Sequence, residues 1–492
     1  MRPKDRKSTD SKENDLQGGY WESRPGDKVI RHPRERQISP IQFTIESAKS
    51  IPFLLQYPFL VAYCFIVIIV ICSTLLTLPM MNSTGNTTPY IDAFFTTISA
   101  LTVTGLTINN SAVDWTAAGQ AVILCMIFVG GLAYMLTVIL CVIMIRNRSQ
   151  ISNKQSSLGI VNTSHWKNLA RLAVKIGLFA IGIQVIGLVL LLIKFWFVFS
   201  PGEAIFQAMF QSISSFNNAG FVILNETQSL ASYKADDFLL GVTALLILSG
   251  SISYWVIFDI LRRKRFLTLT LNTKLVLIGS GALILLGAFA FLTFEYNNPV
   301  FFDQLTFWGK LKASLFESIS GRTAGFTVVD YRETSHHTNF VFVFLMLIGG
   351  ASASVAGGLK INTLMIVIVG SFFILRGGRR AGIFGRQITY KQVNGAIILV
   401  FMVLGTIFFT TFMLMLTDPR FLFKDLLFES ASALGTAGLS TGITSELSVS
   451  GKIIIVFNML FGRLGLLLMA MFLMKRHETN NYRYAEERII LG

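Results

Sequence analysis

Four short motifs in this chain share one pattern, in which mostly small or polar residues precede a glycine that is followed by leucine or phenylalanine. The motifs are Thr102-Val103-Thr104-Gly105, Asn217-Asn218-Ala219-Gly220, Arg322-Thr323-Ala324-Gly325 and Gly435-Thr436-Ala437-Gly438. Their final glycines lie 115, 105 and 113 residues apart, which is too long a period for a solenoid repeat. Because the motifs contain no acid, the chemistry open to them is coordination of a cation by main-chain carbonyl oxygens.

Glycine suits this chemistry, because pointing successive carbonyl oxygens at one place requires backbone angles that a side chain would penalise. A short helix is expected before each motif, and the carboxyl end of a helix carries partial negative charge that favours a cation. A divalent ion would normally require carboxylates, which the motifs lack. We therefore expect a monovalent ion that sheds its water at the four motifs.

A single glycine motif of this kind is explained equally well by close helix packing or by a simple turn. Four copies, each set between a short helix and a long apolar segment, are not. The repeat is the specific signal, and no single copy carries it.

The elements that position the motifs are long apolar segments of the length that crosses a bilayer, about 20 residues each. The expected spanning segments are 58–78, 117–145, 169–199, 238–261, 275–294, 340–374, 393–417 and 452–473, and the expected short helices are 91–101, 203–215, 308–320 and 423–434. The sequence thus predicts an all-α membrane protein with four helix–half-helix–helix repeats, or eight spanning helices, around a central pore. The predicted parts are a polar basic tail 1–50, pore repeats 51–155, 156–266, 267–388 and 389–476, and a carboxyl-terminal tail 477–492.

Composition and charge agree with this architecture. Hydrophobic residues make up 52% of the chain and charged residues 14%, and the formal net charge is +15. The basic residues gather in tails and in loops such as 262–265 and 376–386, which all fall on one side if both termini are cytoplasmic. This pattern predicts a multi-pass protein of the plasma membrane that attracts anionic lipid, and it argues against nucleic-acid binding.

A run of small residues interrupts the sixth spanning segment. It reads Gly349, Gly350, Ala351, Ser352, Ala353, Ser354, Val355, Ala356, Gly357 and Gly358, and Lys360 follows it. Each glycine weakens a helix by roughly 1 kcal/mol relative to alanine. One interpretation is a break in the helix below the filter, and the other is close helix packing by small residues.

Arg463 is expected in the middle of the last spanning segment, where an unpaired charge costs several kcal/mol. It is either a cationic barrier beside the pore or a structural group, in an ion pair or as a cap on half-helix carbonyl groups, and both interpretations stay open. The acids Asp92, Glu317 and Glu429 lie on the short helices, and we interpret them as structural.

From about residue 51 onward, the chain resembles the Trk/Ktr/HKT superfamily of potassium transporters, and within it the membrane subunits of bacterial Ktr systems. The residues that carry the resemblance are Phe216-Asn217-Asn218-Ala219-Gly220-Phe221, Gly321-Arg322-Thr323-Ala324-Gly325-Phe326 and the final stretch 484–492, which has alanine where the family often has proline.

The resemblance implies that Gly105, Gly220, Gly325 and Gly438 are filter glycines. Because a serine at the first of these positions goes with sodium permeation in the superfamily, glycine at all four favours potassium. The segment 349–358 would act as an intramembrane gate, and Lys360 is similar to a basic residue that the family keeps there. The resemblance also implies a homodimer docked on a cytosolic nucleotide-binding ring, no cofactor in this chain, potassium as the transported ion and sodium as a candidate activator.

The alternative function is a secondary transporter of potassium or sodium that is coupled to sodium ions or protons. Such a transporter would be expected to show inverted repeats and ionisable groups at mid-membrane. We expect no enzymatic activity, because no Walker sequence is present and the five histidines lie in predicted tails and loops.

Overall fold

The computed structural model describes residues 58–151, 164–224, 229–302, 305–377, 381–466 and 469. The predicted tails 1–50 and 477–492 lie outside the described residues, and everything below concerns the described ranges.

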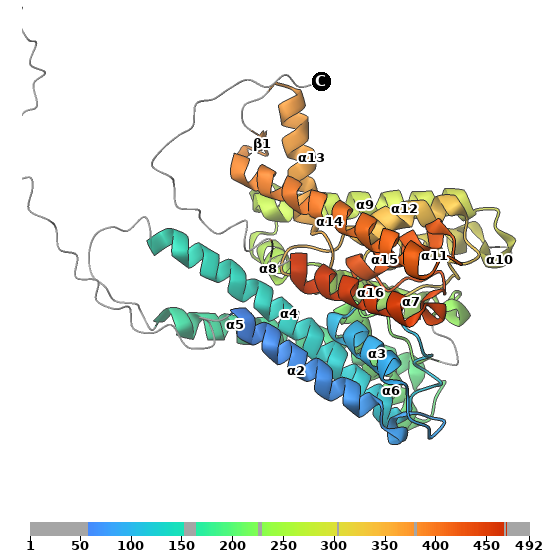
Figure 1. Ribbon diagram of the computed structural model, residues 1–492. Helices are drawn as coiled ribbons and strands as arrows, with labels where there is room; N and C mark the ends of the chain where they lie inside the picture. Colours follow the sequence, from blue (N-terminus) through green and yellow to red (C-terminus); the bar gives the residue numbers. More distant parts are fainter. Residues whose placement is uncertain are drawn as a thin grey trace, which may run out of the picture. The chain divides into compact units, whose positions relative to one another are not determined.

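The described part is mostly helical (Figure 1). The first two predicted repeats comprise α2 (Pro58–Leu76), α3 (Tyr90–Thr102), α4 (Ala117–Ile151), α5 (Ser164–Phe195), α6 (Pro201–Asn217), α7 (Asp237–Ser251) and α8 (Tyr254–Arg263). The third comprises α9 (Leu271–Glu295), α10 (Pro299–Phe302), α11 (Phe307–Ser320), α12 (His336–Leu347), α13 (Ile361–Leu375) and the strands β1 (Ala381–Ile383) and β2 (Arg386–Ile388). The fourth comprises α14 (Tyr390–Thr417), α15 (Phe423–Gly435), α16 (Val449–Leu460) and a π-helical turn, Phe461–Gly465.

The four short helices expected ahead of the glycine motifs are present as α3, α6, α11 and α15. Each packs against a long helix of its own predicted repeat. The repeats also contact one another in a cyclic order, because α4 packs on α6, α7 on α11, α12 on α15, and α16 on α3. The chain of contacts therefore closes on itself, which brings the four short helices together.

By length and composition, four of the described helices can cross a membrane: α4, α5, α9 and α14. The pair α7 and α8 is a fifth if it counts as one span, and parts of α2, α12 and α13 are shorter apolar helices. The predicted total of eight crossings stays a prediction.

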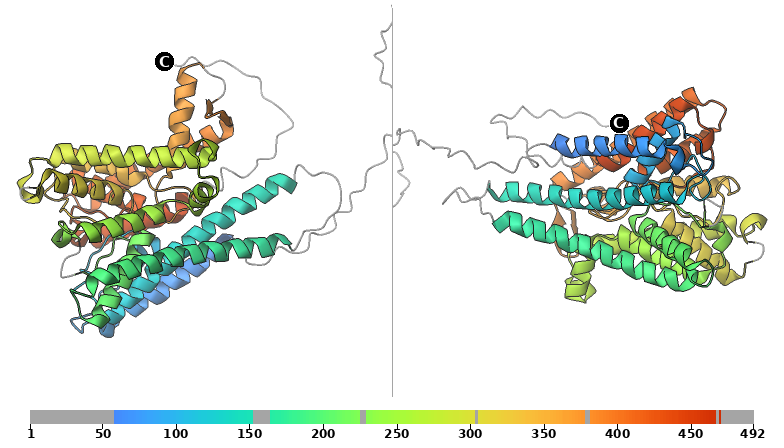
Figure 2. Two further views of the ribbon diagram at one scale, coloured as in Figure 1. Left: turned by 180° about the vertical axis from the view of Figure 1, so that it is seen from behind. Right: turned by 90° about the horizontal axis from the view of Figure 1, so that it is seen from below.

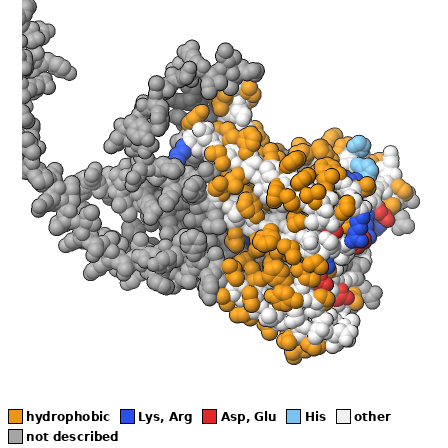
Figure 3. Space-filling view, viewed as in Figure 1, with side chains coloured by type: hydrophobic (Ala, Val, Ile, Leu, Met, Phe, Trp, Pro, Cys, Tyr) orange, Lys and Arg blue, Asp and Glu red, His pale blue; other side chains and the backbone are white. Residues whose placement is uncertain are grey.

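The faces of the long helices are apolar where they are exposed. Figure 2 shows α2, α4 and α5 running side by side, and their outer surfaces carry residues such as Leu178 and Ile186. In Figure 3 apolar side chains cover the middle of the visible face, whereas acidic, basic and histidine side chains gather at the end where α10 lies. Such an apolar surface is expected where helices face lipid.

One predicted helix is wrong. The segment 238–261 was expected to be continuous, but it is split into α7 and α8, which are bent by 96°. The bend begins just after Gly250, whose missing side chain lets the carbonyl oxygen of Phe216 at the end of α6 approach the helix. An ideal Cβ at Gly250 would overlap that oxygen, so the small residue permits the contact and the helix stops one residue later.

Candidate cation filter and inner loop

The short helices all end in a loop that carries a glycine motif. Helices α3, α6 and α15 end at a residue in the left-handed conformation, namely Val103, Asn218 and Thr436. In the third repeat α11 ends earlier, and the left-handed residue is Thr323. Two residues after each of these comes the motif glycine, also with positive φ.

The motifs therefore alternate in backbone handedness. In the first, Val103 has a φ of 55° and Gly105 a φ of 92°, and the residue between them is not in the left-handed region. The same alternation recurs at Asn218 and Gly220, Thr323 and Gly325, and Thr436 and Gly438. Only glycine adopts these angles without steric cost. The asparagine, threonine and valine residues with positive φ therefore carry some backbone strain. Four loops with one unusual backbone pattern are consistent with one shared role.

The four motif glycines lie against one another in a closed order. An ideal Cβ on Gly220 would lie 2.9 Å from the carbonyl oxygen of Ala324, and one on Gly325 would lie 2.8 Å from that of Ala437. The remaining two contacts, even closer, are Gly105 with the carbonyl oxygen of Ala219 and Gly438 with that of Thr104. Each glycine thus faces the carbonyl group of the residue before the glycine in the next loop, and the fourth loop returns to the first.

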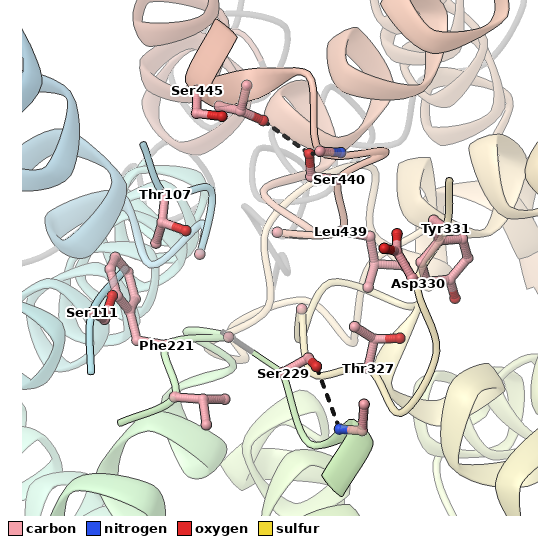
Figure 4. Close-up of a pocket in the computed structure, with 18 of the residues that line it drawn as sticks. Thr107, Ser111, Phe221, Ser229, Thr327, Asp330, Tyr331, Leu439, Ser440 and Ser445 are labelled. Carbon is pink, nitrogen blue, oxygen red and sulfur yellow. Dashed lines mark hydrogen bonds between the residues drawn. The ribbon is translucent and has the colours of Figure 1, made fainter. Parts of the chain in front are cut away.

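A cavity of about 390 Å³ opens beside this ring, with all four glycines in its lining. Figure 4 shows that its wall is shared by four parts of the chain, marked by Thr107, Phe221, Thr327 and Ser440. Hydroxyl side chains recur in the lining, and among the described residues it holds one carboxylate, Asp330, and one guanidinium, Arg332. A hydrated cation would meet polar groups here before it reached the ring.

Serines on the short helices hold the loops and were missed by the sequence analysis. The hydroxyl of Ser99 accepts a bond of 3.1 Å from the amide of Gly105, and that of Ser214 donates to the carbonyl oxygen of Phe221 at 2.8 Å. Ser320 donates to Phe326 in the same way. A serine recurs at the equivalent place in the fourth repeat, Ser432. This recurrence was visible in the sequence and would have identified them.

Glycines on the following helices were also missed. Gly130 and Gly462 lie against the carbonyl oxygens of Leu101 and Leu434, near the ends of α3 and α15, just as Gly250 lies against Phe216. A side chain at these positions would collide with the main chain of the short helix. They bring each second helix close to the filter loop of its own predicted repeat.

The predicted filter residues that are not glycine have buried side chains with different surroundings. Thr102 and Thr104 share a hydroxyl–hydroxyl bond of 2.7 Å, and the amide of Asn218 pairs with the hydroxyl of Ser251 at 2.7 Å. Thr323 and Thr436 have buried hydroxyl groups that make no hydrogen bond among the described residues.

Arg322 belongs to the third motif, but its side chain leaves the ring. Its guanidinium donates to the carbonyl oxygens of Ser280 on α9 at 3.4 Å and Gly349 at 3.3 Å. The side chain is 6% exposed. Arg322 therefore links the filter loop to the first residue of the small-residue segment and is a deep charge that the sequence analysis did not single out.

The small-residue segment 349–358, which we call the inner loop, does interrupt the helix: α12 ends at Leu347 and α13 begins at Ile361. Its main chain is bonded to the bend in the second repeat, where the amides of Ala351 and Val355 donate to Ser251 and Gly250 at 2.9 and 3.1 Å. All of its residues except Ser352 are buried.

The inner loop lies directly against the filter. Gly357 faces the hydroxyl of Thr436 and the carbonyl oxygen of Gly435, and Gly358 faces Gly435 as well. An ideal Cβ on Gly357 would overlap the Thr436 hydroxyl. Two glycines of the inner loop are therefore needed for it to approach the fourth motif this closely.

Two further cations, the buried Arg463 and the half-buried Lys360, hold the inner loop. Nη1 of Arg463 donates to the carbonyl oxygen of Val355 at 2.6 Å, and Nζ of Lys360 donates to that of Ala356. Both cations also lie over the ring of Tyr134, at 4.0 Å for the Arg463 guanidinium carbon and 5.1 Å for the Lys360 nitrogen. Neither has a carboxylate partner among the described residues. Arg463 thus has a structural partner in the inner loop and lies on the π-helical turn.

The predicted structural acids have structural partners. Asp92 on α3 forms an ion pair of 2.9 Å with Lys452 on α16, which joins the first and fourth repeats. Glu317 and Glu429 are fully buried and hydrogen-bonded. The described residues contain no group of three or more histidine, cysteine or acidic side chains that could hold a metal.

Apolar helices, a ring of glycine loops and a polar cavity beside it define a membrane protein of the transport class. A comparison with protein families matches residues 43–484 to TrkH, described as "Cation transport protein". The chain belongs to this family.

Curated proteins and a solved structure are similar to the chain. It is 35% identical to the potassium/sodium uptake protein NtpJ of Enterococcus hirae over 88% of this chain and 96% of that protein. It is 34% identical to the Ktr system potassium uptake protein B of Bacillus subtilis, with the same coverage. The crystal structure of the potassium transporter TrkH from Vibrio parahaemolyticus matches its fold with a TM-score of 0.64 at 17% identity, over 84% of each chain.

Proposed function

We propose that this protein takes up potassium through a channel-like pore whose filter is the ring of Gly105, Gly220, Gly325 and Gly438. The observation that carries the proposal is the cyclic contact in which each glycine faces a carbonyl group of the next loop. Carbonyl oxygens that converge in this way replace the hydration shell of a monovalent cation.

Potassium is the proposed ion because all four motif positions are glycine and because the relatives carry potassium in their names. The Enterococcus hirae relative is named for sodium as well. Sodium is therefore both the natural competitor in a selectivity test and a candidate activator.

The inner loop is proposed as the gate below the filter. It is buried apart from Ser352, and it contacts the fourth motif. The buried cations Arg322 and Arg463 and the half-buried Lys360 donate to its carbonyl groups. With the loop in place, these cations donate their hydrogen bonds to it. When it moves aside, they would line the inner end of the pore, so Arg463 would serve both as a latch and as a barrier.

The direction of transport follows from the predicted topology. With both termini in the cytoplasm, the cavity lined by Thr107 and Ser440 faces outward and potassium passes inward. The membrane potential supplies about 2.3 kcal/mol per charge for every 100 mV.

Regulation is proposed to come from a cytosolic nucleotide-binding ring on which a homodimer of this chain docks. The support is that similar proteins are named as components of a Ktr system. The basic tails and the basic loops between the repeats would face both this partner and anionic lipid.

The test is flux into liposomes that contain the purified protein, with potassium and sodium measured separately under imposed voltage. The proposal predicts potassium flux that follows its own electrochemical gradient. Flux that requires a fixed stoichiometry of sodium ions or protons would favour the coupled secondary transporter, and a preference for sodium would overturn the potassium filter.

A further inference from the structure

The four short helices can be aligned residue by residue through their hydrogen bonds to the filter loops. In each, the residue before the motif glycine donates its amide proton to the carbonyl oxygen of a serine. The pairs are Thr104 with Ser99, Ala219 with Ser214, Ala324 with Ser320 and Ala437 with Ser432, at 2.8 to 2.9 Å. Three residues before each serine, the aligned positions hold Thr96, Gln211, Glu317 and Glu429.

In the third repeat this position holds a buried acid that is hydrogen-bonded to the loop beyond the filter. Glu317 accepts hydrogen bonds from the amide of Val328 at 2.6 Å, the hydroxyl of Tyr331 at 2.7 Å and the hydroxyl of Thr327 at 2.9 Å. The donors stand two, three and six residues after Gly325. The carboxyl group is fully buried.

The fourth repeat has the same arrangement from different residues. Glu429 accepts hydrogen bonds from the amide of Thr441 at 3.1 Å, the hydroxyl of Thr444 at 2.8 Å and the hydroxyl of Ser440. These donors again stand two, three and six residues after the motif glycine, Gly438. Glu429 is also fully buried.

In the first two repeats the aligned position holds no acid. The hydroxyl of Thr96 donates to the carbonyl oxygen of Asp92 one turn earlier on its own helix, and the amide of Gln211 donates to Ser215. Among the described residues, neither of these side chains bonds to the loop beyond its glycine, and in the second repeat a neutral side chain, Gln207, donates to the carbonyl oxygen of Ile223 at 3.2 Å. Two loops of the ring are therefore braced from behind by carboxyl groups, and two are not.

We propose that Glu317 and Glu429 are positioning residues that set the selectivity of the filter. This inference rests on the proposed function. Each carboxyl group ties the outer half of a loop to the helix that carries it, so that the carbonyl groups at Gly325 and Gly438 resist closing around a smaller ion. Hydrogen bonds to a carboxyl group are stronger than those between neutral groups when the acid is ionised, and a buried group without its partners is costly.

The test is the permeability ratio of potassium over sodium, taken from reversal potentials in liposomes for Glu317→Ala and Glu429→Ala. Loss of a brace should lower the ratio roughly tenfold, the effect of about one charged hydrogen bond. Glu317→Gln and Glu429→Gln keep an acceptor oxygen of similar reach and should restore part of the ratio. A role in folding alone would reduce the amount of protein and the total flux but would leave the ratio unchanged.

Matched controls lie next to each acid. Ser318 is buried on α11 and donates to Ile284 on α9 rather than to the filter loop, and Ser430 is buried on α15 without a hydroxyl partner in the described residues. Ser318→Ala and Ser430→Ala should keep the wild-type ratio.

If the alanine variants are not recovered from membranes, Tyr331→Phe and Thr444→Val test the inference, because each removes one hydrogen-bond donor and leaves the acid in place. Each should lower the permeability ratio. Unchanged ratios in the recovered variants would overturn this inference while the potassium filter stands. A wild-type protein that does not discriminate the two ions would instead overturn the proposed function itself.

Discussion

The guanidinium carbon of Arg463 lies over the ring of Tyr134, 4.0 Å from its centroid, while its Nη1 donates to the carbonyl oxygen of Val355. The ring therefore supports the cation that holds the inner loop. Tyr134 stands on α4, in the first repeat, and Arg463 stands in the fourth. A contact between the two ends of the pore sequence thus fixes a loop that belongs to the third.

Tyr134→Ala should raise potassium flux about two- to thirtyfold, because a cation–π contact contributes roughly 0.5–2 kcal/mol to the closed arrangement. The measurement is the initial rate of uptake in liposomes without a regulatory partner. Tyr134→Phe keeps the ring and should behave as wild type. Equal effects of the two substitutions would show that the contact of Arg463 with the ring face does not hold the inner loop in place.

Shortening the inner loop by deletion of residues 352–354 should raise potassium flux without lowering the potassium-over-sodium ratio. The reason is that the deletion removes one exposed and two buried residues from a segment that is proposed to fill the space below the filter. Ala353→Gly keeps the length and relieves a left-handed alanine (φ 66°), so its flux should stay near wild type. A folded deletion variant with less flux than wild type would argue against a gate.

Gly105→Ser should raise sodium permeation, because a side chain there collides with the carbonyl group of Ala219 in the next loop. The disturbance should therefore reach two loops at once. Gly85→Ser is the matched control: Gly85 also has positive φ (72°), but nothing lies within 4 Å of an added Cβ. Reversal potentials should shift for the first and not for the second. Equal shifts, or none, would remove Gly105 from the filter.

Asp92→Asn should lower the thermal stability of the purified protein and leave the permeability ratio unchanged. The pair with Lys452 joins the first and fourth repeats and is largely buried, so its loss should cost about 1–3 kcal/mol. Fluorescence-detected thermal unfolding measures the effect. Lys452→Met should have a similar effect, and the double variant should cost less than the sum. An altered ratio at full stability would mean that Asp92 acts on the ion.

The sequence predicted the helices well because apolar length and glycine placement are local properties. The short helices, the four motifs and the break at 349–358 all have signals within about 20 residues. The bend after Ser251 has a weaker signal, since serines and a glycine lie there without proline. The carbonyl oxygen of Phe216 approaches Gly250 just before the bend, and no local pattern reveals this contact with another helix.

The partners of the deep charges were beyond prediction for the same reason. Arg463 left two interpretations open, because its contacts with Val355 and Tyr134 join residues hundreds of positions apart. Arg322 was placed in the filter by its position, whereas its side chain reaches the inner loop. The serine on each short helix, by contrast, recurs six residues before the motif glycine in three repeats and five before it in the third, and could have been found.

The most direct test of the central claim is the potassium-over-sodium permeability ratio of four single variants, Gly105→Ala, Gly220→Ala, Gly325→Ala and Gly438→Ala, beside the wild type in liposomes. If the loops form one filter, the wild type prefers potassium and every variant that is recovered folded has a lower ratio. A wild type that does not discriminate the two ions, or a folded variant that keeps the wild-type ratio, would contradict the account.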